Sequence, residues 1–225
     1  AMAEYCIAWG DYVFEIPEEV SSEAGAMSDI LGVAVHTVNR SRIIQGSDVV
    51  CLGGGPAGIL TALVALSGGA AKAFLVEKSE LAREIIQRFD NCVAIDANDQ
   101  NACEKIRSMT GPQGCGAIYD SIGYNDVLQS YAELLSPSGY YVNMATQDID
   151  LILPKSLMSA ERVVTSSSNA CYAEIKESVD LIVSGRIAVD KIISHRCTFD
   201  TFLDNFDLLL KEPKEAYKVV LNVSA

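Results

Sequence analysis

The amino-acid sequence predicts an α/β protein built on a doubly wound, parallel, six-stranded sheet. Between residues 48 and 166, short apolar runs alternate with longer segments of helical length. Strands that alternate with helices favour parallel pairing through right-handed crossovers. The runs are apolar at nearly every position, as expected for strands that are covered on both faces. A hydrophobic fraction of 49% in 225 residues is ample for such a core.

The hydrophobic periodicity sets the expected bounds of each element. The predicted strands are residues 48–52, 73–77, 92–95, 117–120, 140–143 and 162–166, and the predicted helices between them are residues 57–67, 81–89, 102–109, 124–135 and 154–158. Before the sheet we expect an extended segment at residues 3–15 and a buried helix at residues 24–38. After it we expect a helix at residues 173–184, an extended stretch around Ile192, a helix at residues 201–210 and a strand at residues 217–223.

The charge balance argues against nucleic acid and anionic membrane surfaces as partners. The chain has 17 basic and 30 acidic residues, a formal net charge of −13, which repels polyanions. A small anionic ligand stays compatible with this charge, because a loop can present backbone N–H groups to it.

The seven cysteines are odd in number and form no C-x-x-C pair. They predict a reduced, cytoplasmic protein without a disulfide framework or a thiolate zinc site. No apolar stretch has the length of a membrane span, and the first residues lack the basic start of a signal peptide.

A glycine-rich loop separates two of the most hydrophobic segments, in the sequence VVCLGGGPAGILTALVAL at residues 49–66. It fits the pattern G-x-G-x-x-G with Gly53, Gly55 and Gly58. In that pattern the first glycine permits a sharp turn, the second lets a pyrophosphate touch the backbone, and the third lets the helix pack close to the strand. The phosphate then lies at the positive end of the helix. The alternative is an ordinary glycine-rich loop.

The surroundings of the loop favour dinucleotide binding in a Rossmann-type fold. Pro56 suits the first turn of a helix, and we expect Pro56 and Ala57 to line the phosphate site. Glu77 lies 19 residues after Gly58 (77 − 58) at the end of the second strand, where a carboxylate binds a ribose 2′-hydroxyl. An acid there favours NAD over NADP, although Lys78 follows directly. The alternative for Glu77 is a solvated residue at a strand end.

A second ligand loop is predicted in IYDSIGYND, after the fourth strand. Ser121 and Gly123 follow Asp120 at the carboxyl edge of the sheet, where open α/β sheets bind ligands. The alternative is a simple strand-to-helix turn, with Asn125 or Asp126 near the helix cap.

Several segments together resemble the C-terminal two-thirds of zinc-type medium-chain alcohol and polyol dehydrogenases, with sorbitol-, galactitol-phosphate- and threonine-dehydrogenase-like branches the nearest. The segments that carry the resemblance are AEYCIA, IPEEVSSEAGAMSDILGVAVHTV, the glycine-rich segment with its second strand, YDSIGYNDVLQSYAELLSPSGYYVNM, LIVSGRIAVDKIISHRCTFD and AYKVVLNV. The resemblance implies a remnant of the catalytic domain and a linker at residues 1–25, an NAD-binding Rossmann domain at residues 26–200, and a helix and strand that return toward the catalytic domain at residues 201–225.

The resemblance also implies a chemistry. In this family a zinc ion polarises the oxygen of a small alcohol or polyol, and hydride passes to NAD. Asp29 occupies the family position of a zinc ligand, although it could instead cap its helix. The other family ligands, a Cys and a His, belong to an N-terminal domain outside this sequence. Zinc is therefore expected only together with that domain, and this chain alone is expected to bind NAD without turning over an alcohol.

Neither histidine completes the predicted zinc site. His36 is expected to be a core or packing residue, and His195 to be structural or near the domain junction. Two other functions stay open: a non-catalytic dinucleotide-binding subunit or sensor, and a methyltransferase that uses S-adenosylmethionine, whose sheet would end in a reversed strand. An exposed apolar strand at residues 162–166 predicts a homodimer through the sheet edge.

Overall fold

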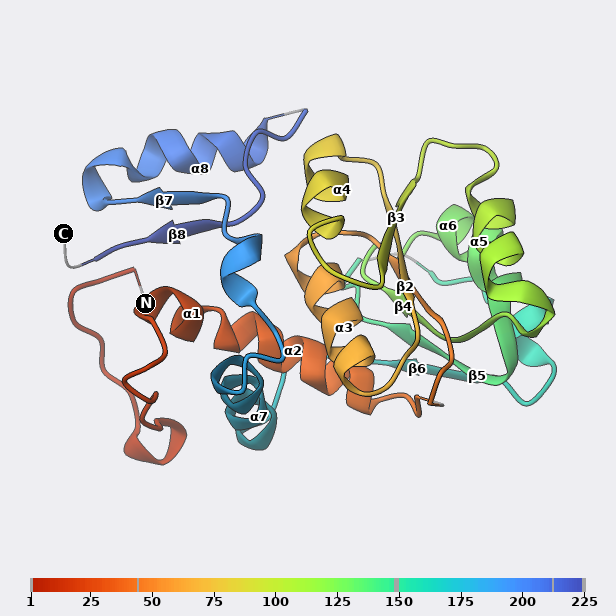
Figure 1. Ribbon diagram of the computed structural model, residues 1–225, viewed down its shortest axis with the longest axis horizontal. Helices are drawn as coiled ribbons and strands as arrows, with labels where there is room; N and C mark the ends of the chain where they lie inside the picture. The colour runs from red at the N-terminus through yellow and green to blue at the C-terminus, as the bar shows by residue number, and fades with distance from the viewer. Residues whose placement is uncertain (1, 44, 148–149, 212, 224–225) are drawn as a thin grey trace.

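A six-stranded parallel sheet, on the right of Figure 1, forms the core of the larger part of the molecule. The structure is a computed structural model and describes residues 2–43, 45–147, 150–211 and 213–223. The strand order is β3-β2-β1-β4-β5-β6, and all neighbours pair in parallel. The strands are β1 (Val49–Leu52), β2 (Ala73–Glu77), β3 (Cys92–Asp96), β4 (Cys115–Asp120), β5 (Leu135–Asn143) and β6 (Val163–Ser166). The predicted doubly wound sheet is confirmed.

Helices cover both faces of this sheet (Figure 1). One face carries α2 (Ser28–Asn39), α3 (Pro56–Ser67) and α4 (Glu80–Ile86), and the other carries α5 (Ala102–Thr110) and α6 (Asn125–Tyr131). Alternate strand residues therefore enter two separate cores: Val49 and Cys51 pack on the first face, Val50 and Leu52 on the second. The strand order reverses between β1 and β4, and such a reversal opens a crevice at the carboxyl ends of the strands.

Some predicted bounds are wrong, and tertiary contacts explain the differences. The helix predicted at residues 24–38 is split at the buried Met27 into α1 (Ser22–Ala26) and α2. The helix predicted at 124–135 ends as a 3₁₀ turn at Ala132–Leu134, because Leu135 already pairs with Cys115 in the sheet.

Three shorter stretches also differ from the prediction. Residues predicted to be extended around Ile192 form a 3₁₀ helix, Val189–Ile192, whose two end residues are buried. A further 3₁₀ turn, Gly10–Tyr12, interrupts the segment expected to be extended at residues 3–15, and Lys155–Met158 is 3₁₀ rather than α-helical.

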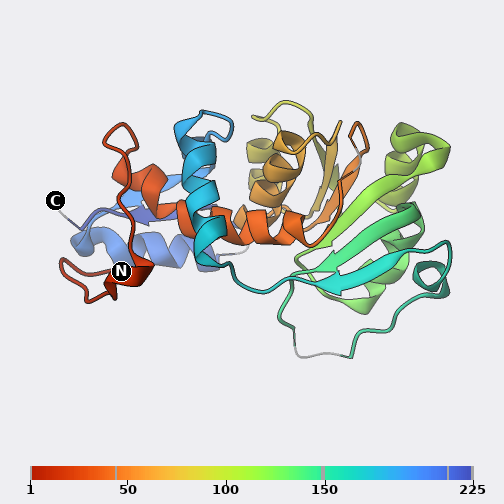
Figure 2. The ribbon, with the colours of Figure 1, turned by 90° about the horizontal axis from the view of Figure 1, so that it is seen from below.

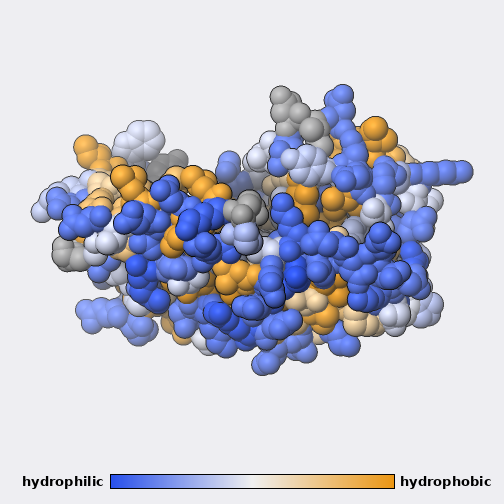
Figure 3. All heavy atoms as spheres, turned by 90° about the horizontal axis from the view of Figure 1, so that it is seen from above, coloured by the Kyte–Doolittle hydropathy of each residue, from blue (hydrophilic) through white to orange (hydrophobic). Residues whose placement is uncertain are grey.

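A small C-terminal unit lies beside the main sheet, and Figure 2 shows α2 running toward it. Strand β7 (His195–Cys197) pairs in parallel with β8 (Val219–Leu221), and α8 (Phe202–Leu210) packs on both. Strand β7 lies before the boundary predicted between residues 200 and 201, whereas its partner strand β8 lies after it. Hydrophobic side chains reach the surface around α8 (Figure 3), among them Leu203 and Leu210. The predicted domain boundaries themselves stay a prediction.

The helices α2 and α7 (Tyr172–Val183) pack at close range (Figures 1 and 2). A Cβ on Gly32 would meet the Ile175 side chain and lie 3.2 Å from the Ile175 Cα. Ser178 Oγ donates a hydrogen bond of 2.8 Å to the Ser28 carbonyl. His36, expected to be a packing residue, lies at this contact, and its Nδ1 is 2.8 Å from Oε1 of Glu174.

The seven cysteines are all unpaired, and those at positions 51, 115 and 197 are buried in strands. Burial raises the pKa of Cys115 to about 12, so its thiol stays protonated and serves as a small hydrophobic group. Among the residues described, no helix combines the length and apolarity needed to cross a membrane.

Replacing Gly32 with alanine should lower the free energy of unfolding relative to Gly25→Ala by about 1–3 kcal/mol. Both changes add a methyl group within a helix and gain similar helix propensity. At Gly25 the methyl meets only the flexible Ile16 side chain, whereas at Gly32 it also presses on the α7 backbone. Urea denaturation measures both variants, and equal midpoints would contradict the close contact between α2 and α7.

Candidate functional site

The turn from β1 into α3 has almost no side chains. Gly53 has a φ of +94°, and a Cβ on Gly53 would collide with Ser121 Oγ. A Cβ on Gly58 would collide with the Gly53 carbonyl. Gly55 is the N-cap of α3, and a Cβ there would meet no atom within 4 Å. Gly53 and Gly58 thus have the turn and packing roles expected of them, while Gly55 leaves open space at the N-terminus of α3.

The first turn of α3 supplies an electrostatic reason for an anion to bind there. Pro56 is the first helical residue and Ala57 the second, and the first N–H groups of a helix lack partners inside the helix. Together with the helix dipole, these N–H groups make such an end favourable for a phosphate.

Glu77, the last residue of β2, is half-buried and fixes the glycine loop. Its Oε2 accepts a hydrogen bond of 2.8 Å from the Gly54 N–H, and its Oε1 accepts one of 2.8 Å from the Ser79 N–H. It is therefore not a fully solvated strand end. A carboxylate accepts up to about four hydrogen bonds, so acceptor capacity remains for a ribose hydroxyl.

The loop after β4 meets the glycine loop from the neighbouring strand. Ser121 Oγ donates a hydrogen bond of 2.8 Å to the Leu52 carbonyl, so this side chain ties β4 to the end of β1. Asp120 is completely buried, and Oδ1 accepts from the Ile122 and Gly123 N–H groups at 2.8 and 2.9 Å. Gly123 has a φ of +74°, which closes this turn.

The carboxylate of Asp120 has a third donor, the Tyr141 hydroxyl, which lies 2.7 Å from Oδ2. Burial, and then the nearby Asp120 charge, raises the pKa of Tyr141, so the hydroxyl keeps the proton that it donates. The loop after β4 is thus a rigid wall of the crevice. Asn125 opens α6, and neither it nor Asp126 is the N-cap, which is Tyr124.

Two further residues of the site, Tyr217 and Lys218, lie near the C-terminus and were not predicted from the sequence. The Tyr217 hydroxyl donates a hydrogen bond of 2.6 Å to the Gly54 carbonyl and is buried. Burial, followed by the proximity of Glu77, raises the pKa of Tyr217. Lys218 lines a cavity of about 320 Å³ together with Pro56, at the first turn of α3. No local pattern marks Tyr217, since its role depends on a contact across 163 positions.

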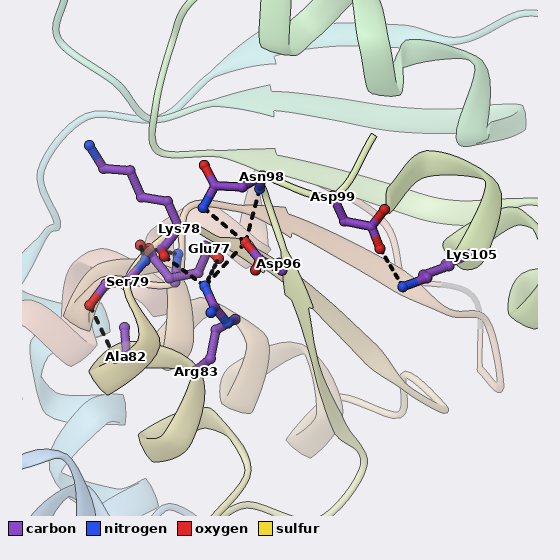
Figure 4. Close-up of polar contacts among 10 residues, drawn as sticks. Glu77, Lys78, Ser79, Ala82, Arg83, Asp96, Asn98, Asp99 and Lys105 are labelled. Atoms are coloured by element: carbon purple, nitrogen blue, oxygen red, sulfur yellow. Dashed lines mark hydrogen bonds and ion pairs between the residues drawn. The ribbon is translucent and has the colours of Figure 1, made fainter. Parts of the chain in front are cut away.

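The outer end of the crevice carries a group of charged residues (Figure 4). Lys78 is exposed, and its side chain extends on the side away from Asp99 and Lys105. Arg83 of α4 folds back, and its Nη1 donates to the Glu77 and Lys78 carbonyls at 3.0 and 2.6 Å. The same nitrogen lies 3.3 Å from Oδ1 of Asp96, the last residue of β3. An acid ends two neighbouring strands, a signal that was readable in the sequence for Asp96 as well as for Glu77.

The candidate zinc ligand lies away from the glycine loop in the chain. Asp29 is exposed in the first turn of α2, where the N-cap is Met27 and no side chain caps the helix. The alternative interpretation of Asp29 as a cap is therefore wrong. His195 lies in β7, 3.0 Å from the Ser194 hydroxyl. Within the described part of the chain, no group of three or more His, Cys, Asp or Glu side chains is placed to hold a metal.

Comparison with known proteins agrees with this geometry. The sequence profile described as zinc-binding dehydrogenase matches residues 56–184, more than half of the chain. The chain belongs to the zinc-binding dehydrogenase family. The resemblance to zinc-type alcohol and polyol dehydrogenases is thereby confirmed.

Two curated proteins are similar to this chain over most of its length. A sorbitol dehydrogenase of Bombyx mori is 27% identical over 217 residues, which are 95% of this chain and 62% of that protein. A D-xylulose reductase of Saccharomyces cerevisiae is 23% identical over 225 residues, 98% of this chain and 63% of that protein. The chain thus spans about three-fifths of the length of these relatives.

Solved structures of similar proteins share the fold. An alcohol dehydrogenase from Thermus sp. ATN1 matches with a TM-score of 0.84 at 23% identity, over 92% of this chain and 60% of that one. A Sinorhizobium meliloti 1021 protein assigned to the zinc-binding dehydrogenases and bound to NADP matches with a TM-score of 0.78 at 26% identity, over 92% and 61%. A dehydrogenase from Escherichia coli CFT073 complexed with NADH matches with a TM-score of 0.81 at 19% identity, over 93% and 62%.

The family match removes the methyltransferase alternative. That class was expected to end its sheet in a reversed strand, whereas β6 runs parallel to β5. The family match does not separate NAD from NADP, because its structural neighbours include both coenzymes.

Replacing Tyr217 with phenylalanine should lower the free energy of unfolding by about 1–2 kcal/mol, because a buried backbone acceptor would lose its donor. Urea denaturation measures the change. Tyr124→Phe, at an exposed tyrosine, serves as the matched control and should stay within about 0.5 kcal/mol of the parent chain. Equal stability of both variants would show that the Tyr217–Gly54 hydrogen bond contributes nothing.

Proposed function

We propose that this chain is the coenzyme-binding part of an NAD-dependent, zinc-type alcohol or polyol oxidoreductase. The observation that carries the proposal is the open space at Gly55, at the N-terminus of α3, with the carboxylate of Glu77 across the loop. Backbone N–H groups of Gly55 and Ala57 would hold the diphosphate, and Gly53 and Gly58 allow the loop to approach it. Glu77 would bind a hydroxyl of the adjoining ribose.

NAD is the coenzyme that the ribose end favours. The carboxylate of Glu77 would repel a 2′-phosphate, and its contact with the Gly54 N–H keeps it at the loop. Lys78 is exposed, and a single exposed ammonium group does not by itself form a phosphate site. Ser121 and Gly123 would shape the other wall of the crevice, with Ser121 acting through the Leu52 carbonyl.

The substrate class follows from the relatives, which include sorbitol dehydrogenase and D-xylulose reductase. A small alcohol or polyol would give hydride to the bound nicotinamide, and zinc would supply the polarisation of its oxygen. The residues described here do not fit a zinc site by themselves. Asp29 would join such a site only where a longer protein adds ligands.

Gly55→Ala should weaken NADH binding by about tenfold or more, a loss of about 1.4 kcal/mol. The added methyl group meets no protein atom, so it would block the diphosphate without disturbing the fold. Titration of NADH fluorescence with the 225-residue chain measures the dissociation constant.

Gly10→Ala is the matched control, because a Cβ at Gly10 also meets nothing within 4 Å. It should bind NADH like the parent chain. If Gly55→Ala binds NADH as tightly as Gly10→Ala, or if the parent chain binds no NADH, the proposed site is wrong.

The edge of the sheet supports a homodimer as the assembly of this chain. Strand β6 pairs with β5 on one side, and Val163 is 38% exposed in it. An exposed apolar edge strand can pair with its own copy across a twofold axis.

Val163→Lys should convert such a dimer into a monomer, because two like charges would face each other across the twofold axis. Light scattering after size-exclusion chromatography measures the mass. Val183→Lys, at a valine of 41% exposure on α7, is the control and should leave the dimer intact. A monomeric parent chain, or a dimeric Val163→Lys variant, would rule out this edge as the interface.

A further inference from the structure

We propose that Asp96 is a specificity-determining residue that keeps Arg83 from serving a 2′-phosphate, and thereby favours NAD over NADP. This inference rests on the proposed function, because it assigns a selectivity device to the same coenzyme site. The sequence predicts that Glu77, at the end of β2, sets the preference for NAD over NADP. Asp96 lies at the end of the neighbouring strand and is its register partner.

Arg83 is a cation at the ribose end of the site. Its Nη1 bonds to the carbonyls of Glu77 and Lys78, the residues that flank the predicted ribose contact. Its side chain is 20% exposed, so it is within reach of a ligand at this edge. An arginine so placed is the kind of residue that accommodates the 2′-phosphate in proteins that bind NADP.

Asp96 opposes that use of Arg83 in two ways. Its Oδ1 lies 3.3 Å from Arg83 Nη1 and compensates the positive charge. The same oxygen accepts hydrogen bonds from the Asn98 N–H and side-chain amide, at 2.9 and 3.1 Å, so the carboxylate is held in place. Its side chain is 43% exposed, and its own negative charge therefore acts on any phosphate that approaches.

The charges at the carboxyl ends of β2 and β3 sum to zero, and this zero net charge disfavours NADP, which carries an extra phosphate. Glu77 and Asp96 contribute two negative charges, and Lys78 and Arg83 two positive ones (Figure 4). Removal of the charge on Asp96 leaves the edge with one net positive charge next to the ribose. At a partly exposed site, one charge within several ångströms changes phosphate affinity by about tenfold.

The experiment measures NADH and NADPH dissociation constants by fluorescence, at one fixed ionic strength, for the 225-residue chain and its variants. Asp96→Asn keeps an oxygen that accepts from Asn98 and removes the charge. It should raise the affinity for NADPH relative to NADH by about tenfold, with the NADH dissociation constant changed less than threefold.

Asp99→Asn is the matched control, since it makes the same chemical change three positions further along the chain. Asp99 pairs with Lys105 and lies apart from Arg83 (Figure 4). The ratio of its NADPH and NADH dissociation constants should stay within about twofold of that of the parent chain, because the cation that this change frees, Lys105, lies apart from Arg83 (Figure 4).

The mechanism through Arg83 is tested in an Arg83→Gln background. There Asp96→Asn should change the ratio of the two dissociation constants by a smaller factor than in the parent chain, since the cation that it releases is gone and only the direct repulsion between Asp96 and the phosphate is removed. An unchanged ratio in Asp96→Asn, an equal change in Asp99→Asn, or a full change in the Arg83→Gln background would each overturn the inference. These outcomes leave NADH binding by the parent chain intact, whereas its loss would overturn the proposed function itself.

Discussion

The close contact between the start of α3 and the end of β1 is the constraint on which the rest of the site depends. A side chain at Gly58 would run into the Gly53 carbonyl, and Gly53 has a backbone conformation that side chains disfavour. The helix therefore begins at once after the strand, and its N-terminus faces the crevice where the strand order reverses. Were this turn wider, the first N–H groups of α3 would lie away from the carboxyl ends of the strands, and neither Glu77 nor the loop after β4 would stand beside them.

One residue, Gly54, joins three distant parts of the chain at this turn. The Gly54 N–H bonds to Glu77 at the end of β2, and the Gly54 carbonyl bonds to Tyr217, just before β8. The C-terminal unit of β7, β8 and α8 thus touches the glycine loop directly, and the cavity lined by Pro56 and Lys218 lies along that contact.

Much of the fold was predictable because periodicity and composition are local signals. The bounds predicted for β2 are those of the structure, and the glycine pattern predicts the turn into α3. The split at Met27 and the 3₁₀ turn at Ile192 were not predictable, since each depends on what covers a buried side chain. For the same reason the sequence indicated Glu77 and missed Tyr217: one follows a glycine pattern at a fixed spacing, and the other reaches Gly54 from 163 positions away.

The acidity of the chain raises a question that the local structure answers: how a protein of net charge −13 could hold a diphosphate. At physiological ionic strength charges are screened beyond about 8 Å, so most of the acidic surface does not act on the loop. The groups that lie close to the loop are the N-terminus of α3 and the balanced group of Glu77, Lys78, Arg83 and Asp96. The diphosphate would meet a local positive end, while the ribose would meet an edge with no net charge. A second phosphate on that ribose would gain little from such an edge, and the distinction between the two coenzymes then follows from where charges are paired rather than from how many the chain contains.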